Sequence, residues 1–210
     1  MKIISHRGYW KEEKEKKSDS AFHRTFKLGF GTETDFRDFN NELVISHDAP
    51  VKGEQLSVNE FCDIYNEYDN SLPLALNIKS DGLQNHIEEL IITKKINNYF
   101  VFDMSMPDTI GYLTKNMNVF IRQSEYEKDL PFYNEAKGIW LDAFKSIWYT
   151  EKTIETHISN GKKVAIVSAE LHKRDYIKHW KTLKEWSIID NEKIILCTDF
   201  PELAIKYFKK

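Results

Sequence analysis

Two histidines in the first quarter of the chain are each followed directly by residues suited to phosphate or proton chemistry. His6 precedes Arg7 and Gly8, and His47 precedes Asp48. An imidazole ordinarily titrates near neutrality, so it can both accept and donate a proton. An arginine beside it offers a bidentate clamp for a phosphate group, and a neighbouring carboxylate can orient the ring. These pairs indicate acid–base chemistry on a phosphate-containing substrate.

Two carboxylates, Glu33 and Asp35, are two residues apart in a segment that reads as a strand. Side chains with this spacing point to the same face of a strand. Two carboxylates side by side on an inward face repel each other unless a cation or a proton joins them. Oxygen ligands of this kind suit Mg²⁺ or Ca²⁺. The alternative at this stage is that Arg37 and a lysine neutralise the pair without a metal.

Further polar residues recur where one predicted strand after another ends. In a barrel of parallel strands the carboxyl ends converge on one mouth, where active sites are found. The recurrence therefore favours one shared site over scattered surface residues. Beyond those already named, the residues at strand ends are Asn77, Lys79, Asp103, Arg122, Asp142, Ser168, Glu170, Thr198 and Asp199.

Short apolar runs alternate with amphipathic segments along the whole chain, which indicates a β/α architecture. The expected strands are Lys2–Ser5, Gly31–Phe36, Leu43–Ser46, Leu74–Ile78, Tyr99–Met104, Val119–Arg122, Gly138–Asp142, Lys163–Ser168 and Ile194–Thr198. The expected helices are Ser20–Leu28, Ser57–Glu67, Leu83–Lys95, Pro107–Lys115, Thr150–Asn160, Asp175–Glu185 and Pro201–Phe208.

Eight strand–helix units, with Leu43–Ser46 as an extra strand, favour a small (β/α)8 TIM barrel over a doubly wound sheet. The segment Gln123–Glu135 shows no clear helix, so one crossover helix is expected to be missing. The length of 210 residues predicts a single domain over residues 1–210.

The composition excludes several classes of function. The formal net charge is −3 and no segment is strongly basic, which argues against nucleic-acid binding. The run from Lys11 to Lys17 is interrupted by glutamates and reads as a solvated loop. Cys62 and Cys197 are expected to be free, buried thiols. No signal peptide or transmembrane run is visible, which predicts a cytoplasmic protein; the sequence gives no indication of oligomeric state.

Taken in order, these motifs resemble the glycerophosphodiester phosphodiesterases. That family has an HRG tripeptide, an Ala-Phe pair in an early helix, a G-x-x-x-E-x-D stretch and a strand ending in His-Asp. This chain has His6-Arg7-Gly8, Ala21-Phe22, the stretch from Gly29 to Asp35, and His47-Asp48. The segment from Cys197 to Pro201 is similar to the family's closing T-D-x-P, so the likeness runs from the first strand to the last.

The resemblance implies a phosphodiesterase barrel that acts on a small phosphodiester with one divalent cation, Mg²⁺ or Ca²⁺. It implies that His6 and His47 are the general acid and base, and that Glu33 and Asp35 hold the cation. The phosphate contacts implied are Arg7 and Lys79, and we add Arg122 as a candidate. The attacking group is left open: it is water, or a hydroxyl of the substrate, which would give a cyclic phosphate.

The chain departs from the family pattern at two places that bear on the site. Asn77 stands where the family has a third metal carboxylate, and its amide oxygen can still coordinate. As a hypothesis, Asp103 at the end of the adjacent strand supplies the missing carboxylate; alternatively Asp103 caps the helix that begins near Pro107. The family's E-N-S/T stretch before the early helix is replaced by Lys16-Lys17-Ser18.

Three functions therefore stay open on sequence. The first is a metal-dependent phosphodiesterase. The second is a degenerate barrel that binds a phosphorylated ligand without turnover, which Asn77 and the altered early loop favour. The third is a phospholipase-D-like or inositol-phospholipid-cleaving relative on the same barrel. A headgroup pocket would draw on residues late in the chain, namely Arg122, Ser124, Glu125, Glu170, His172 and Lys173.

Overall fold

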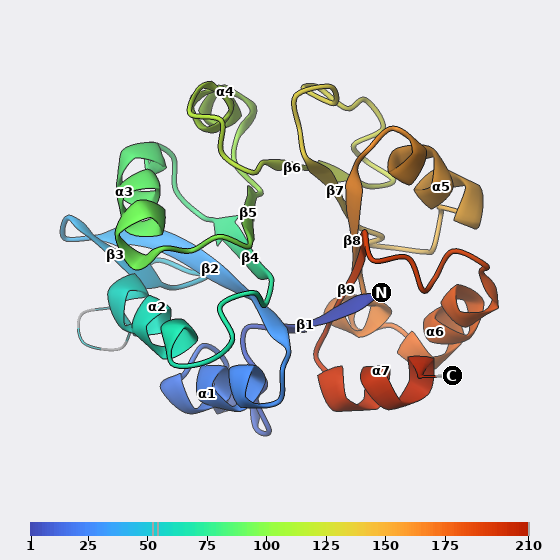
Figure 1. Ribbon diagram of the computed structural model, residues 1–210, viewed down its shortest axis with the longest axis horizontal. Coiled ribbons are helices and arrows are strands. Elements are labelled where there is room, and N and C mark those ends of the chain that lie inside the picture. Colours follow the sequence, from blue (N-terminus) through green and yellow to red (C-terminus); the bar gives the residue numbers. More distant parts are fainter. Residues whose placement is uncertain (52, 54, 210) are drawn as a thin grey trace. The chain divides into compact units, whose positions relative to one another are not determined.

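Strands and helices alternate along the chain in the computed structural model, which describes residues 1–51, 53 and 55–209 (Figure 1). The strands are β1 Lys2–His6, β2 Gly31–Phe39, β3 Glu42–Ile45, β4 Leu74–Ile78, β5 Tyr99–Phe102, β6 Phe120–Gln123, β7 Gly138–Leu141, β8 Lys163–Val167 and β9 Ile194–Thr198. The α-helices are α1 Asp19–Lys27, α2 Val58–Asn66, α3 Gln84–Lys94, α4 Met106–Thr114, α5 Glu151–Ser159, α6 Tyr176–Glu185 and α7 Pro201–Phe208. Two short 3-10 turns, η1 Glu13–Glu15 and η2 Ala169–His172, complete the described elements.

Nearly all of the predicted elements are present, with ends displaced by one or two residues. The largest difference is at β2, which continues to Phe39 instead of ending at Phe36. The extension has a simple cause, because β2 turns back through Asn40 and Asn41 and pairs antiparallel with β3 from Phe36↔Ile45 to Phe39↔Glu42. Both asparagines have positive φ, a conformation that this residue type tolerates well.

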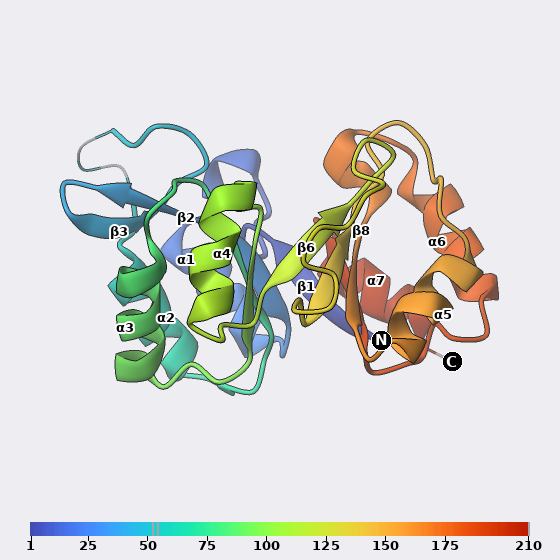
Figure 2. The same ribbon diagram turned by 90° about the horizontal axis from the view of Figure 1, so that it is seen from above.

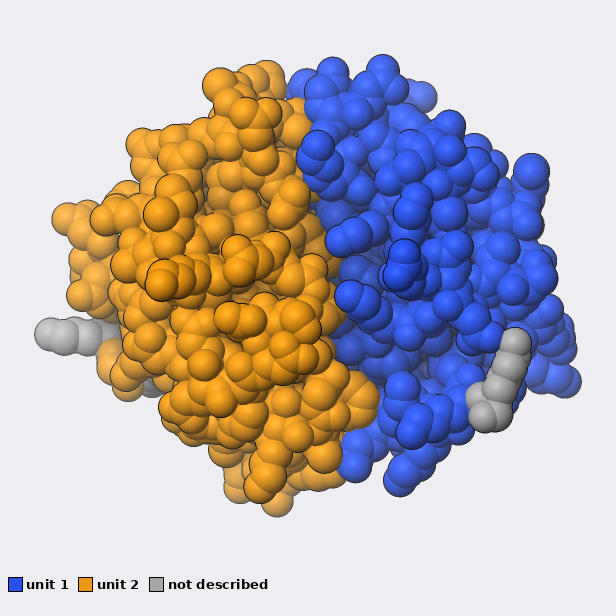
Figure 3. All heavy atoms as spheres, in the orientation of Figure 1, with its two compact units in different colours: residues 1–4, 120–210 blue, residues 5–119 orange. Residues whose placement is uncertain are grey.

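Two compact units make up the chain, and each is described by itself (Figure 3). Unit 1 comprises residues 1–4 and 120–210, and unit 2 comprises residues 5–119; β1 is divided between them. In unit 2 the strand order is β5-β4-β2-β1, with β3 beside β2, and in unit 1 it is β1-β9-β8-β7-β6. The β2–β4, β4–β5, β6–β7, β7–β8 and β8–β9 ladders are parallel. The single domain expected from the length stays a prediction.

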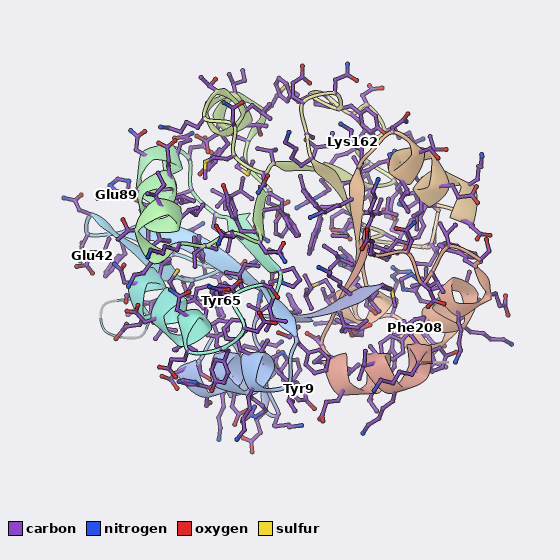
Figure 4. The ribbon with its side chains drawn as sticks, viewed as in Figure 1. Tyr9, Glu42, Tyr65, Glu89, Lys162 and Phe208 are labelled. Atoms are coloured by element: carbon purple, nitrogen blue, oxygen red, sulfur yellow. The ribbon has the colours of Figure 1, made fainter. Side chains whose placement is uncertain are left out.

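Aromatic side chains dominate the core of unit 2. Phe26 on α1 lies edge-on to Tyr65 on α2, and Phe22 and Phe36 lie edge-on to Phe61. Edge-to-face contacts of this kind stabilise by about 1 kcal/mol each beyond area burial. Tyr65 (Figure 4) is buried, and its hydroxyl donates a hydrogen bond to the Leu72 carbonyl. The packing fixes α1 and α2 against the strand that carries the carboxylate pair.

In unit 1 the strands β7, β8 and β9 are almost continuously apolar and buried, as parallel strands covered on both faces should be. Trp180 on α6 is buried, and its indole N–H donates to Ser168 at the end of β8. Between β6 and β7, residues 124–137 form turns and contain no helix, which confirms the missing crossover helix (Figure 2).

Both cysteines are free and buried, as expected. Among the described residues no helix is both long and apolar enough to cross a bilayer. The cytoplasmic location stays a prediction.

Candidate active site

The turn that follows β1 fixes the first histidine–arginine pair. Arg7 and Gly8 both have positive φ, +59° and +81°. A Cβ on Gly8 would lie 2.9 Å from the Cβ of Ala21, so glycine is required both by the backbone and by the approach of α1. The Arg7 N–H donates to the Glu33 carbonyl at 2.9 Å, and the Gly8 N–H donates to the Thr32 hydroxyl at 3.1 Å. The turn is therefore anchored to α1 and to β2 together.

Asp35 is the centre of an ion cluster inside unit 2. It is fully buried, and its carboxylate oxygens lie 3.0 Å from Arg7 Nε and 3.7 Å from Lys79 Nζ. Lys79 also donates to Asp103 Oδ2 at 3.3 Å, so one ammonium bridges two carboxylates. Arg37, expected as an alternative partner of the acidic pair, donates instead to the Lys79 carbonyl at 2.7 Å. The structure thus gives the neutralising role to Arg7 and Lys79.

Glu33 lies on β2 two residues before Asp35, and it is 2% exposed. Its Oε2 is 3.9 Å from His6 Nε2, at the edge of ion-pair distance. Burial raises the pKa of Glu33, and the negative charge of Asp35 raises it further, while His6, Arg7 and Lys79 lower it. A buried carboxylate with this balance of charges is short of positive partners.

Several buried oxygens in this cluster have no hydrogen-bond donor among the described residues. They are Glu33 Oε2, both carboxylate oxygens of Asp35, and Asn77 Oδ1. Asn77 is directly opposite Asp35 in the parallel β2–β4 ladder, so the two side chains leave the same face of the sheet. Buried polar atoms in proteins are nearly always paired, so this group of unpaired oxygens calls for a partner such as an ion or ordered water.

These oxygens fit an oxygen-seeking divalent cation. Two carboxylates and one neutral amide oxygen are a small donor set of the kind that leaves an ion several waters. No group of three or more His, Cys, Asp and Glu side chains is placed to hold a metal anywhere in residues 1–51, 53 and 55–209. The fit therefore depends on the Asn77 amide as the third donor, and the nature of the ion stays a prediction.

His47 follows β3 in an accessible position, with its side chain 42% exposed against 16% for His6. Its Nδ1 lies 2.9 Å from Asp48 Oδ1, and this hydrogen bond holds the pKa of Asp48 below its usual range. An ionised carboxylate only accepts, so Nδ1 carries the hydrogen and Nε2 is left to exchange a proton. Asp48 orients His47 in the way that the sequence suggested.

Asp103 does not cap the helix that follows it. The N-cap of α4 is Ser105, whose hydroxyl accepts from the Asp108 N–H, and that alternative for Asp103 is wrong. Asp103 has a positive φ of +73° and pairs with Lys79. Its role as an additional metal carboxylate stays a prediction.

The remaining candidates belong to unit 1. Arg122 lies with its guanidinium 5.6 Å over the Phe144 ring, and its Nε is 3.9 Å from Glu127. His172 Nε2 lies 2.6 Å from Asp142 Oδ1, a pairing over 30 residues that the sequence did not reveal. Glu125 accepts the backbone N–H groups of residues 144–146 and so shapes a loop. Contact of any of these with a phosphate or a headgroup stays a prediction.

One charged residue of unit 2 was overlooked. Lys17 ends the run that reads as a solvated loop, yet its side chain is partly buried and the charges acting on it include those of Asp35, Arg7 and Glu33. The only sequence signal was its position directly before the serine that caps the early helix.

Solved structures share the path of the whole chain. A Galdieria sulphuraria protein proposed to be a glycerophosphodiester phosphodiesterase is 15% identical, with a TM-score of 0.77 over 100% of this chain and 98% of its own. A glycerophosphodiester phosphodiesterase from Agrobacterium tumefaciens is 13% identical, with a TM-score of 0.73 over 99% and 98%. The fold is a (β/α)8 barrel.

A third barrel is a phosphodiesterase from Oleispira antarctica in complex with its product sn-glycerol-3-phosphate. It is 11% identical, with a TM-score of 0.74 over 100% of this chain and 97% of its own. By sequence alone, no family model and no curated protein matches the chain. The resemblance to the glycerophosphodiester phosphodiesterases is thus confirmed at the level of the barrel fold, and activity has to be argued from the site.

Proposed function

We propose that this barrel is a divalent-cation-dependent phosphodiester hydrolase of the glycerophosphodiester phosphodiesterase type. The observation that supports it most is the cluster around Asp35. Two cationic side chains, Arg7 and Lys79, flank it, and buried oxygens of Glu33, Asp35 and Asn77 lack donors beside His6. The negatively charged oxygens of a phosphoryl group can pair with the two cationic side chains, and a divalent metal ion can be coordinated by the unpaired oxygens.

The residues divide the work of phosphodiester cleavage between them. Charge builds on the phosphoryl oxygens as the bond breaks, and Arg7 and Lys79 are the side chains that stabilise it. His6 and His47 carry the proton to the leaving alkoxide and take one from the attacking hydroxyl. Asp48 keeps the His47 ring in the tautomer with Nε2 available. A bound divalent cation would supply further electrostatic stabilisation of the phosphoryl oxygens, held by Glu33, Asp35 and Asn77.

The substrate class follows from the barrels that this chain resembles. The Oleispira antarctica phosphodiesterase holds sn-glycerol-3-phosphate as product, and we carry to this chain a small phosphodiester with glycerol on one side.

A panel of phosphodiesters with each divalent cation tests this function. Glycerophosphodiesters should turn over in Mg²⁺ or Ca²⁺, lose turnover with a chelator and regain it when the ion is restored. The double variant His6→Ala/His47→Ala, purified in the same way, controls for a contaminating enzyme. Turnover that is equal in the double variant, or absent from every substrate and ion, contradicts the proposal.

A second candidate is a barrel that binds a phosphorylated ligand without cleaving it. The neutral Asn77 in the donor set is the observation that favours it, because one charge fewer weakens the hold on a cation. Tight binding of sn-glycerol-3-phosphate with no turnover of any diester in the panel would select this candidate.

A further inference from the structure

Lys17 is held in place by the same turn that carries Arg7. Its N–H donates to the Arg7 carbonyl at 2.9 Å, and its φ is +66°. The next residue, Ser18, is the N-cap of α1 and accepts the Ala21 N–H. The backbone of Lys17 is thus fixed at both sides, so the origin of its side chain is as well defined as that of Arg7.

The partly buried Lys17 side chain starts from the turn that carries Arg7, and the charges of the cluster in unit 2 act on it. Asp35, Asp48 and Glu33 act on its ammonium as attractive charges and Arg7 as a repulsive one, while burial lowers its pKa. Lys17 in turn helps to lower the pKa of Asp48. A lysine on a fully solvated loop would not interact electrostatically with buried carboxylates to this extent.

No hydrogen bond or ion pair joins the Lys17 ammonium to another residue in the part of the chain that the structure describes. The neighbouring lysine behaves differently, since Lys16 pairs with Glu13 at 3.1 Å and lies over the Trp10 ring. Arg7 and Lys79 are also committed, each to Asp35. Lys17 is therefore a partly buried cation beside the site, and its ammonium donates to none of the described residues.

We propose that Lys17 is a third phosphate-binding cation of this site and that its ammonium contacts the phosphoryl oxygens of the bound substrate. The inference rests on the proposed function. An ammonium carries three donors and a compact charge, which suits an oxyanion. Arg7 and Lys79 each form an ion pair with Asp35, whereas the Lys17 ammonium forms none with a described residue and so keeps its donors for a ligand. The stretch at which this chain departs from the family's E-N-S/T pattern thus gains a role in substrate binding.

The competing role is that Lys17 only offsets the negative charge of Asp35 and Glu33. The two roles predict opposite responses to removal of the ammonium. A phosphate-binding lysine leaves weaker phosphate binding when it is lost. A charge-offsetting lysine leaves phosphate binding unchanged and tightens the binding of Mg²⁺, because the carboxylates then carry less compensated charge.

Calorimetry with Mg²⁺ present can measure the affinity of the full chain for inorganic phosphate and for sn-glycerol-3-phosphate. The comparison is between the wild type and Lys17→Met. The expected loss of affinity is about tenfold, the size of one charge-assisted hydrogen bond. Lys17→Arg should recover most of it, and the matched control Lys14→Met should change nothing, since Lys14 is 81% exposed and pairs with Glu12. With a diester substrate, KM should rise more than kcat falls.

Unchanged phosphate affinity in Lys17→Met overturns the inference, and unchanged phosphate affinity with tighter Mg²⁺ binding assigns the charge-offsetting role instead. The binding measurement keeps this test separate from that of the proposed function. A wild-type protein that binds phosphate through Lys17 but cleaves no diester contradicts the activity and supports the inference. A wild-type protein that binds neither phosphate nor sn-glycerol-3-phosphate overturns both.

Discussion

Buried acidic side chains are treated differently in the two units of this chain. In unit 1, Glu170 accepts hydrogen bonds from the hydroxyls of Ser168 and Thr198 and from the Asp199 N–H. In the same unit, Asp142 Oδ1 accepts from the Ala143 N–H at 2.8 Å and lies 2.6 Å from His172. Each of these carboxylates has its donors supplied by the fold.

Glu33 and Asp35 in unit 2 are more deeply buried than these two residues and have fewer hydrogen-bond donors. Glu33 Oε2 and both oxygens of Asp35 lack a hydrogen-bond donor, and Arg7 and Lys79 approach Asp35 without hydrogen-bond geometry. Burial of a carboxylate without hydrogen-bond donors costs free energy, and the charges of Arg7 and Lys79 offset part of that cost. The difference supports the proposed ion site at Glu33 and Asp35 and a structural role for Glu170 and Asp142.

The largest expected difference between the acidic residues of the two units is in their effect on turnover. His6→Ala should lower kcat for a glycerophosphodiester by about 10²- to 10⁴-fold, because it removes one of the two proposed proton carriers. His172→Ala, which also removes a histidine beside a buried carboxylate, should lower kcat by no more than about threefold, because its partner Asp142 keeps the Ala143 N–H. Steady-state kinetics of the two variants side by side measures this. Equal losses of kcat in the two variants would show that the number of hydrogen-bond donors around a carboxylate does not distinguish a functional residue from a structural one.

The next effect concerns stabilisation by a divalent cation. At an ion concentration of 100 times Kd, the wild type should gain about 2.7 kcal/mol in free energy of unfolding. Glu33→Gln should lose most of that gain, since it removes a charged donor of the proposed ion site. Glu170→Gln should keep it, although the pKa of Glu170 is likewise raised by burial.

Thermal unfolding with and without Mg²⁺ or Ca²⁺ provides the measurement. The shift in Tm between the two conditions is the quantity to compare, because both substitutions also change stability in the absence of metal. A cation-induced shift that survives in Glu33→Gln, or disappears in Glu170→Gln, would remove the proposed ion from the carboxylate pair.

The smallest effect sharpens the comparison through a buried histidine of unit 1. His179 hydrogen-bonds with the Tyr149 hydroxyl, and burial lowers the pKa of His179 to about 4. The unfolded chain takes up a proton near pH 6.5 and the folded chain does not, so stability is lost as the pH falls from 6.5 towards 4.

The loss attributable to His179 should be about 1 kcal/mol per pH unit within this window. Denaturant unfolding at several pH values should therefore give a flatter profile for His179→Gln than for the wild type. His86→Gln, on an exposed position of α3, is a suitable control that should leave the profile unchanged. Parallel profiles for the wild type and His179→Gln would contradict the assignment.

The fold was largely predictable from the sequence, because apolar period and turn residues act locally. Leu74–Ile78, Ile194–Thr198 and Pro201–Phe208 were predicted to the residue. The 3-10 turns η1 and η2 were not, since three or four residues are too few for a period to show.

The site was predictable where chemistry and position coincide, and not where it depends on tertiary contacts. Glu33 and Asp35 share a face by spacing alone. The bridge from Lys79 to Asp103, and the burial of Lys17, depend on how loops return to the cluster. Asp103 was a plausible helix cap on sequence, but Ser105 lies closer to the first turn and takes that role.

The anchored turn after β1 also has an entropic consequence. The N–H groups of Arg7, Gly8 and Tyr9 are all accepted by oxygens of β2 or α1. The stem of the guanidinium is therefore immobilised when the chain folds, before any substrate arrives. Association then has little backbone freedom left to remove at this point, so more of the contact energy is retained as affinity.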